Sequence, residues 1–134
     1  MPEDAPIVAI IDDDKIFQLT ASKTILASQV TDRILQFENG EDALLFLKNN
    51  LSNPAVLPDY IFLDINMPFV DGWMFLEDYA KLKSDLSKIV TIYMVSSSID
   101  PRDIARAKNN SNIADYVVKP VTSDKFAALL QRAA

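Results

Sequence analysis

The stretch VAIIDDDK, residues 8–15, joins four apolar residues directly to three consecutive aspartates. It belongs to the first of five apolar stretches, which lie at residues 6–11, 33–37, 60–65, 88–95 and 115–119. Most of these stretches are continuous apolar runs, a pattern typical of strands that are covered on both faces. The sequence therefore predicts five buried strands, and the first of them ends at the aspartates.

The segments between these strands show the spacing of amphipathic helices. Apolar or small residues recur on one helical face at Phe17, Ala21, Thr24 and Ile25, at Phe75, Leu76 and Tyr79, and at Phe126, Leu129 and Leu130. Helix starts are indicated by Asn39-Gly40 and by Asp100-Pro101, which offer a capping side chain and a proline at the first helical position. Strands that alternate with helices predict a doubly wound α/β domain with a five-stranded parallel sheet and five helices.

Composition limits both the size of the domain and its chemistry. The chain has 134 residues, 49% of them hydrophobic and 24% charged, with a net charge of -6. We expect one domain over residues 1–134, with residues 1–5 as a flexible tail and 48–59 as a surface loop. Because the chain has no Cys and no His, disulfides, zinc sites of the usual ligands and a histidine base are excluded.

The charge and hydropathy of the chain also bear on its partners and location. An acidic surface disfavours nucleic acid as a partner. No apolar run approaches the length of a membrane span, and the N-terminal residues MPEDAP are polar and proline-containing instead of resembling a secretory leader. The sequence therefore predicts a cytoplasmic protein that binds neither nucleic acid nor membrane.

Polar residues follow four of the predicted strands. Asp12, Asp13 and Asp14 follow the first, Asp64 ends the third, Ser96, Ser97 and Ser98 follow the fourth, and Lys119 ends the fifth. In a parallel α/β sheet these ends meet at one edge, where ligands bind. Two carboxylates ~5 Å apart repel by about 3 kcal/mol at an effective dielectric constant of ~20. The cluster therefore predicts a hard divalent cation, Mg²⁺, for which Mn²⁺ can substitute.

Each of these residues, taken singly, has an ordinary structural explanation. Asp14 fits the N-cap of the next helix, the three serines fit a turn, and Lys119 fits an exposed surface position. Their joint placement at one edge favours a functional site.

Four segments carry a resemblance to a known family. IIDDD (10–14), YIFLDINMPFVDG (60–72), YMVSSS (93–98) and YVVKP (116–120) occur in this order over nearly the whole chain. Together they resemble the receiver domain of two-component response regulators, most closely the free-standing, chemotaxis-type receivers. The resemblance implies a flavodoxin-like fold with sheet order 2-1-3-4-5 and an aspartyl-phosphate switch that needs Mg²⁺.

The resemblance also implies a role for each matching residue. Asp64 corresponds to the phosphoacceptor, Asp13 to the principal acidic metal ligand with Asp12 beside it, Asn66 to a ligand through its backbone carbonyl, Ser96 to the hydroxyl that contacts the phosphoryl group, Lys119 to the phosphate-binding lysine and Tyr116 to the aromatic switch residue. Asp64 would itself complete the metal site. The Lys119-Pro120 peptide bond is expected to be cis, as in the family.

Two other functions compete with this interpretation. A phosphatase of the haloacid dehalogenase type also has an Asp-x-Asp motif after its first strand, which Asp12 and Asp14 could form with Asp12 as the nucleophile. Lys15 and Ile16 do not match the residues that complete that family's signature, and the chain has no room for its cap domain. In a phosphatase of this type, Asp64 would also have no catalytic role. A degenerate receiver that only binds proteins is the second alternative, but the acids, hydroxyl and lysine are all present.

The sequence thus predicts a single-domain response regulator and not a classical enzyme. Its phosphoryl donor would be the phosphohistidine of a sensor histidine kinase or of a histidine phosphotransfer protein. Residues 120–134 are needed for the last helix, so output would pass through an unidentified protein partner. The expected partner surface is the face of the fourth helix, fifth strand and fifth helix.

Overall fold

Five strands and five helices alternate along the chain, as predicted. The computed structural model describes residues 5–131. The elements are β1 (Val8–Ile11), α1 (Lys15–Ala27), β2 (Ile34–Phe37), α2 (Gly40–Asn49), β3 (Tyr60–Asp64), α3 (Gly72–Leu82), the 3-10 turn η1 (Lys83–Asp85), β4 (Thr91–Ser96), α4 (Pro101–Lys108), β5 (Asp115–Val118) and α5 (Ser123–Leu130).

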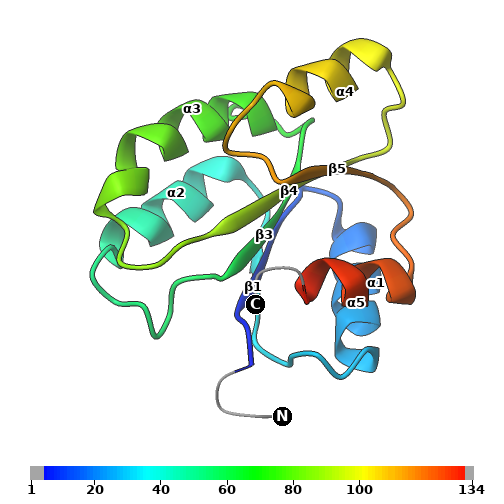
Figure 1. Cartoon of the computed structure of the whole chain (residues 1–134), viewed down its shortest axis with the longest axis horizontal. Coiled ribbons are helices and arrows are strands. Elements are labelled where there is room, and N and C mark those ends of the chain that lie inside the picture. The colour runs from blue at the N-terminus through cyan, green and yellow to red at the C-terminus, as the bar shows by residue number, and fades with distance from the viewer. Residues whose placement is uncertain (1–4, 132–134) are drawn as a thin grey trace.

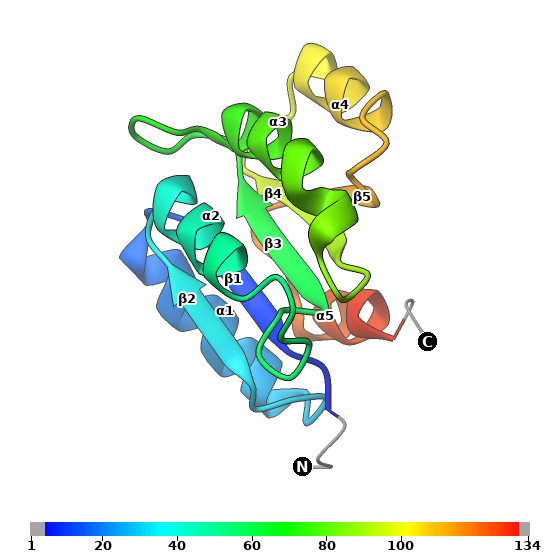
Figure 2. The same ribbon diagram turned by 90° about the vertical axis from the view of Figure 1, so that its left-hand side faces the viewer.

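The strands form one parallel sheet in the order β2-β1-β3-β4-β5. Helices α1 and α5 cover one face of this sheet, and α2, α3 and α4 cover the other (Figures 1 and 2). This arrangement confirms the doubly wound, flavodoxin-like fold with sheet order 2-1-3-4-5. The strand order reverses between β1 and β3, so their carboxyl ends border the crevice in which such folds bind ligands.

Two hydrophobic cores explain why the strands are continuous apolar runs. Val8 and Ile10 of β1 point into the core with α1 and α5, while Ala9 and Ile11 point into the core with α2 and α3. The same alternation runs through β3 and β4, because successive side chains of a strand point to opposite faces of the sheet. The buried positions of these central strands are therefore apolar or aromatic until β3 reaches Asp64 and β4 reaches Ser96.

Side-chain caps set where the helices begin. Asn39 and Asp100 accept backbone hydrogen bonds at the starts of α2 and α4, which confirms the two predicted starts. Asp14, Asp71 and Thr122 do the same for α1, α3 and α5. Asp14 therefore has the capping role that the ordinary explanation gave it, and its carboxylate is engaged by the helix that follows the acidic cluster.

Two buried tyrosines attach the last helix to the sheet. The hydroxyl of Tyr60 donates to the Leu130 carbonyl at 2.8 Å, and that of Tyr93 donates to the Leu129 carbonyl at 2.9 Å. Carbonyls at a helix C-terminus have no partner within the helix, so these hydroxyls satisfy groups that would otherwise be buried without one. The sequence pattern identified Leu129 and Leu130 as core residues but not these bonds.

The predicted loop and tail are partly packed. Residues 50–59 form the loop, since 48 and 49 belong to α2, and Leu57 and Pro58 within it are buried. Residues 1–4 of the predicted tail lie outside the described residues, whereas Ala5 is buried and its carbonyl accepts a hydrogen bond from the Arg33 guanidinium at 3.1 Å.

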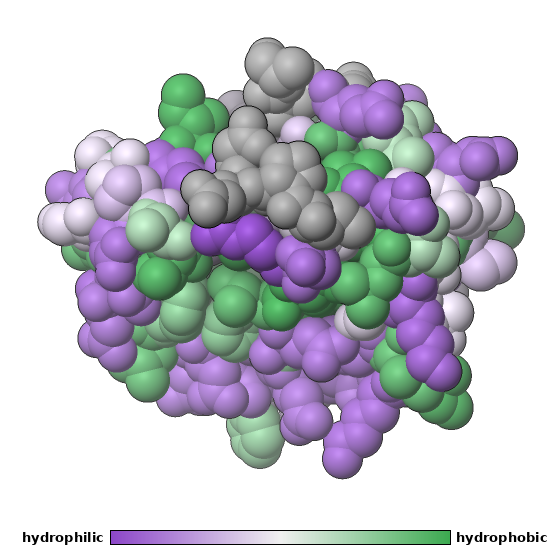
Figure 3. Space-filling model, turned by 90° about the horizontal axis from the view of Figure 1, so that it is seen from below, coloured by the Kyte–Doolittle hydropathy of each residue, from purple (hydrophilic) through white to green (hydrophobic). Residues whose placement is uncertain are grey.

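The end of the molecule opposite the acidic edge is the end at which the strands begin. In Figure 3 this surface shows hydrophobic side chains in its middle and hydrophilic ones around them. Within residues 5–131, none of the helices combines the length and the apolar character required to cross a bilayer.

Candidate functional site

Three carboxylates meet at the carboxyl ends of β1 and β3. One oxygen from each of Asp12, Asp13 and Asp64 lies within 4.8 Å of the others. Asp12 and Asp64 are buried and Asp13 is exposed. β1 and β3 are paired in register through Ile11 and Leu63, so the two acids that follow these residues leave adjacent strands at the same level. This is a hard, oxygen-only donor set with one side open to solvent, which fits Mg²⁺ or Mn²⁺.

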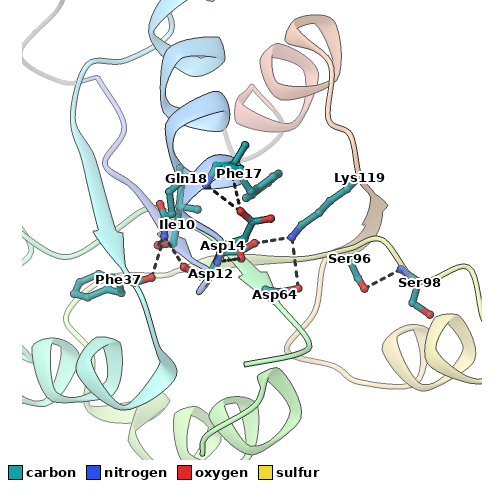
Figure 4. A network of polar contacts seen from close by, with 11 residues as sticks. Ile10, Asp12, Asp14, Phe17, Gln18, Phe37, Asp64, Ser96, Ser98 and Lys119 are labelled. Atoms are coloured by element: carbon teal, nitrogen blue, oxygen red, sulfur yellow. Dashed lines mark hydrogen bonds and ion pairs between the residues drawn. The ribbon is translucent and has the colours of Figure 1, made fainter. Parts of the chain in front are cut away.

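Lys119 enters the cluster from the end of β5. Its ammonium lies 2.8 Å from Asp12 Oδ2 and 3.7 Å from Asp64 Oδ1 (Figure 4). The backbone of Lys119 is held by a 2.9 Å hydrogen bond from its N–H to the Ser96 carbonyl, and the Lys119-Pro120 peptide bond is cis, as expected. The lysine side chain is only 17% exposed, so its charge is directed into the site and not into solvent.

Burial is the main cause that raises the pKa values of the two buried carboxyls of the site, Asp12 and Asp64. The pKa of Asp64 is raised to about 6, first by burial and then by the charge of Asp12, and this value already includes the opposing charge of Lys119. Burial also raises the pKa of Asp12, although the hydrogen bonds from Lys119 and from the Asp14 N–H oppose this. A cation among the carboxylates would favour their charged forms and so strengthen Asp64 as a nucleophile.

Gln18 is a component of the site that the sequence analysis missed. From the buried face of α1 its amide nitrogen lies 3.0 Å from the Ile10 carbonyl, 3.1 Å from the Asp12 carbonyl and 3.0 Å from the Phe37 carbonyl (Figure 4). The amide thereby ties the carboxyl ends of β1 and β2 to α1. The sequence did contain a sign of this role. Gln18 is polar but lies on the same helical face as Ala21 and Ile25, which follow it by three and seven residues and are buried like it.

Gly72 allows α3 to begin against the backbone of the central acid. A Cβ at this position would lie 2.5 Å from the Asp64 carbonyl oxygen and 3.0 Å from the Ile65 Cα. The Gly72 N–H donates to the Ile65 carbonyl at 2.8 Å, so the turn after β3 closes back on itself. This close approach fixes the backbone on which the Asp64 side chain stands.

Ser96 and Tyr116 are joined through the loop after β4. The buried Ser96 hydroxyl accepts a hydrogen bond from the Ser98 N–H at 3.0 Å. The Tyr116 hydroxyl donates to the Ser98 carbonyl at 2.8 Å, so it is bound to the protein and not only to solvent. The Ser98 hydroxyl donates to Asp103 of α4 at 2.8 Å. Ser98 therefore contacts the site, α4 and β5, a role the sequence analysis did not assign.

The loop after β3 carries Asn66 and a backbone feature that the sequence did not reveal. Asn66 is exposed two residues beyond Asp64, at the edge of the site. Phe69 has a positive φ of 66° and is 92% exposed. An aromatic residue rarely adopts this conformation. A cleft beside the site is lined by Pro68, Phe69 and Val70 together with Asp13.

The geometry brings Asp12, Asp13, Asp64 and Lys119 together at one edge, with Ser96 buried on the neighbouring strand. A family model described as the response regulator receiver domain matches residues 8–131. The chain belongs to this family. Receivers are phosphoacceptor signalling modules and not classical enzymes, and they partner with histidine kinases. Membership decides between the receiver and the phosphatase that the sequence left in competition.

Known relatives cover nearly the whole of this receiver. It is 28% identical to the chemotaxis protein CheY of Listeria monocytogenes, over 93% of this chain and 96% of that one. It is also 28% identical to part of the sensor histidine kinase CheAY of Helicobacter pylori, over 94% of this chain but 15% of the kinase. Another relative, at 24% identity, is the probable methanogenesis regulatory protein FilR2 of Methanothrix harundinacea, with 90% of this chain and 76% of that protein covered.

Solved structures show the same architecture. A two-component response regulator from Cytophaga hutchinsonii superposes with a TM-score of 0.81 at 29% identity, covering 93% of both chains. A response regulator receiver protein from Dyadobacter fermentans gives a TM-score of 0.80 at 30% identity, covering 93% of this chain and 94% of the other. The three carboxylates of this receiver are thus the acidic triad typical of the family's Mg²⁺ site.

Proposed function

We propose that this receiver is a single-domain, cytoplasmic response regulator that accepts a phosphoryl group on Asp64. The observation that carries the proposal is the position of Asp64, buried beside the acidic pair and 3.7 Å from the Lys119 ammonium. A carboxylate oxygen of Asp64 would attack the phosphorus of a phosphohistidine in a sensor histidine kinase or histidine phosphotransfer protein. The new O–P bond forms as the P–N bond breaks, and the imidazole leaves with the bonding electron pair.

Each residue of the site would have a separate role in this phosphoryl transfer. Asp12, Asp13, Asp64 and the backbone carbonyl of Asn66 would hold Mg²⁺ or Mn²⁺, which when bound supplies positive charge near the transferring oxygens. Lys119 would move from Asp12 toward the phosphoryl oxygens, and the Ser96 hydroxyl would donate to another of them. Positioning and charge neutralisation are most of what phosphoryl transfer requires from a protein.

Mass spectrometry after treatment with acetyl phosphate, with and without Mg²⁺, tests the proposal. We expect one added phosphoryl group that depends on Mg²⁺ and is absent in Asp64→Asn, which retains the shape of the side chain but removes the nucleophile. The matched variant Asp12→Asn tests which aspartate is the nucleophile: label that persists in Asp64→Asn and is lost in Asp12→Asn would refute Asp64 as the phosphoacceptor. A wild-type protein that stays unlabelled would favour the degenerate receiver.

We propose that the signal leaves the site through Ser96 and Tyr116. Movement of the Ser96 hydroxyl toward the phosphoryl group would remove the acceptor of the Ser98 N–H and so disturb the loop that binds Tyr116 and Asp103. Helix α4 can respond because Ala107 is its only buried residue among the eight that form it. A protein partner would read the result on the face of α4, β5 and α5.

Amide NMR of wild type and Ser96→Ala, both treated with beryllofluoride as a phosphoryl mimic, tests this route. Both proteins should show shifts around Asp64, but only wild type should carry them fully to Tyr116 and α4. If the chemical-shift changes reach Tyr116 and α4 equally in Ser96→Ala, the proposed switch roles of Ser96 and Tyr116 would be refuted.

A further inference from the structure

The ring of Phe17 lies next to Lys119, and the phosphoryl-transfer reaction described above gives this ring no role. The Lys119 ammonium lies 4.2 Å from the centroid of this ring, in addition to its contacts with Asp12 at 2.8 Å and Asp64 at 3.7 Å. Figure 4 shows the aromatic side chain of Phe17 reaching from α1 toward the lysine. The ammonium is thus bounded by two carboxylates and one aromatic face.

We propose that Phe17 is a positioning residue for Lys119. Its ring keeps the ammonium beside the carboxylates while the lysine exchanges Asp12 for the phosphoryl oxygens on Asp64. This inference rests on the proposed function and adds a component from α1 to the same site.

An aromatic face suits this task because of its charge distribution. The face of the ring is negative and attracts a cation, most strongly where water is largely excluded, as it is around this 17% exposed lysine side chain. The attraction has no single hydrogen bond that must break, so the ammonium can move across the ring between its anionic partners. A third carboxylate in the same place would instead compete with the phosphoryl oxygens for the lysine.

The local structure of α1 fixes where the ring stands. The Asp14 carboxylate caps the helix and accepts from the Phe17 N–H at 3.1 Å, so the backbone of Phe17 is set one turn after the acidic cluster. The half-buried side chain also packs against the core beneath α1 and α5. A purely apolar packing role is therefore the alternative, and it predicts that a leucine of similar volume would serve equally well.

Phosphorylation rates separate the two roles. We compare Phe17→Leu, which removes the aromatic face, with Phe17→Tyr, which retains it, using acetyl phosphate at saturating Mg²⁺ and mass spectrometry as the readout. Phe17→Leu should lower the maximal rate about threefold to tenfold, and Phe17→Tyr should stay within about twofold of wild type. Phe46→Leu, the same change in a half-buried phenylalanine of α2 that packs against Phe37, should leave the rate within about twofold of wild type.

NMR of the metal-free protein gives a second measurement that does not depend on phosphorylation. Protons on the Lys119 carbon next to the ammonium should show an upfield ring-current shift in wild type and in Phe17→Tyr, and lose it in Phe17→Leu. If Phe17→Leu does not fold, the wild-type and Phe17→Tyr spectra still test the contact.

Three results would overturn the positioning role: an unchanged rate in Phe17→Leu, an equal loss in Phe17→Tyr, or no ring-current shift in wild type. A wild-type protein that accepts no phosphoryl group would instead refute the proposed function, and the positioning role with it.

Discussion

Replacing the central acid should stabilise the metal-free protein. Asp64 is buried next to Asp12, and its pKa rises from 3.8 to about 6 on folding. At about 1.4 kcal/mol for each pKa unit, the ionised carboxylate costs the fold roughly 3 kcal/mol near neutral pH. This cost is a net value, because the pKa already includes the attraction to Lys119 at 3.7 Å. Asp64→Asn removes it but leaves a buried amide with a smaller desolvation cost of its own. We therefore expect the free energy of unfolding to rise by about 1 to 3 kcal/mol.

The pH dependence of this gain follows from the direction of the pKa change. Because the folded-state pKa lies above the unfolded value, the folded protein binds more protons between pH 3.8 and about 6. The wild-type free energy of unfolding should therefore fall, through this group, as the pH rises across that window. The advantage of Asp64→Asn should be complete above the window and absent below it.

Thermal and urea unfolding in the presence of a chelator measure the effect. A gain of this size should raise the Tm by about 3 to 10 °C. Saturating Mg²⁺ should narrow the difference, since a ligand of the folded state stabilises the protein that binds it better. The control is Asp78→Asn, which removes a half-exposed carboxylate paired with the exposed Lys81 at 3.7 Å and should change stability by less than about 1 kcal/mol. An Asp64→Asn protein that is no more stable than wild type above the window would refute the electrostatic reasoning.

Three further substitutions test the supporting structure of the site. Gly72→Ala should destabilise the fold by about 1 to 3 kcal/mol, because the new methyl group would meet the Asp64 carbonyl; a normal urea midpoint would show that α3 can shift freely. Gln18→Met removes the amide that binds three backbone carbonyls and should cost about 1 to 3 kcal/mol in urea unfolding; an unchanged midpoint would mean that water replaces it. Lys119→Ala should tighten Mg²⁺ binding in calorimetric titration, because a competing cation 2.8 Å from Asp12 is gone; weaker binding would show that the lysine instead organises the carboxylates.

The sequence by itself determined the fold and the chemical character of the site. Continuous apolar runs, helical stripes and capping residues are local patterns, and they specify which segments become strands and helices. The helix starts predicted at Asn39 and Asp100 were confirmed, whereas β4 begins at Thr91 and not at residue 88. Since parallel strands bring their carboxyl ends to one edge, Asp12, Asp13, Asp64 and Lys119 could be placed together before any distance was known.

Only the tertiary structure decided how the residues at this edge are held. The Gln18 amide binds carbonyls from two strands, and the Phe17 ring meets a lysine more than 100 positions away in the chain. No local pattern encodes such contacts, because they depend on how α1 lies across the sheet. The raised pKa of Asp64 has the same origin: burial and the nearby charges of Asp12 and Lys119 set it, and these arise only when distant segments pack together.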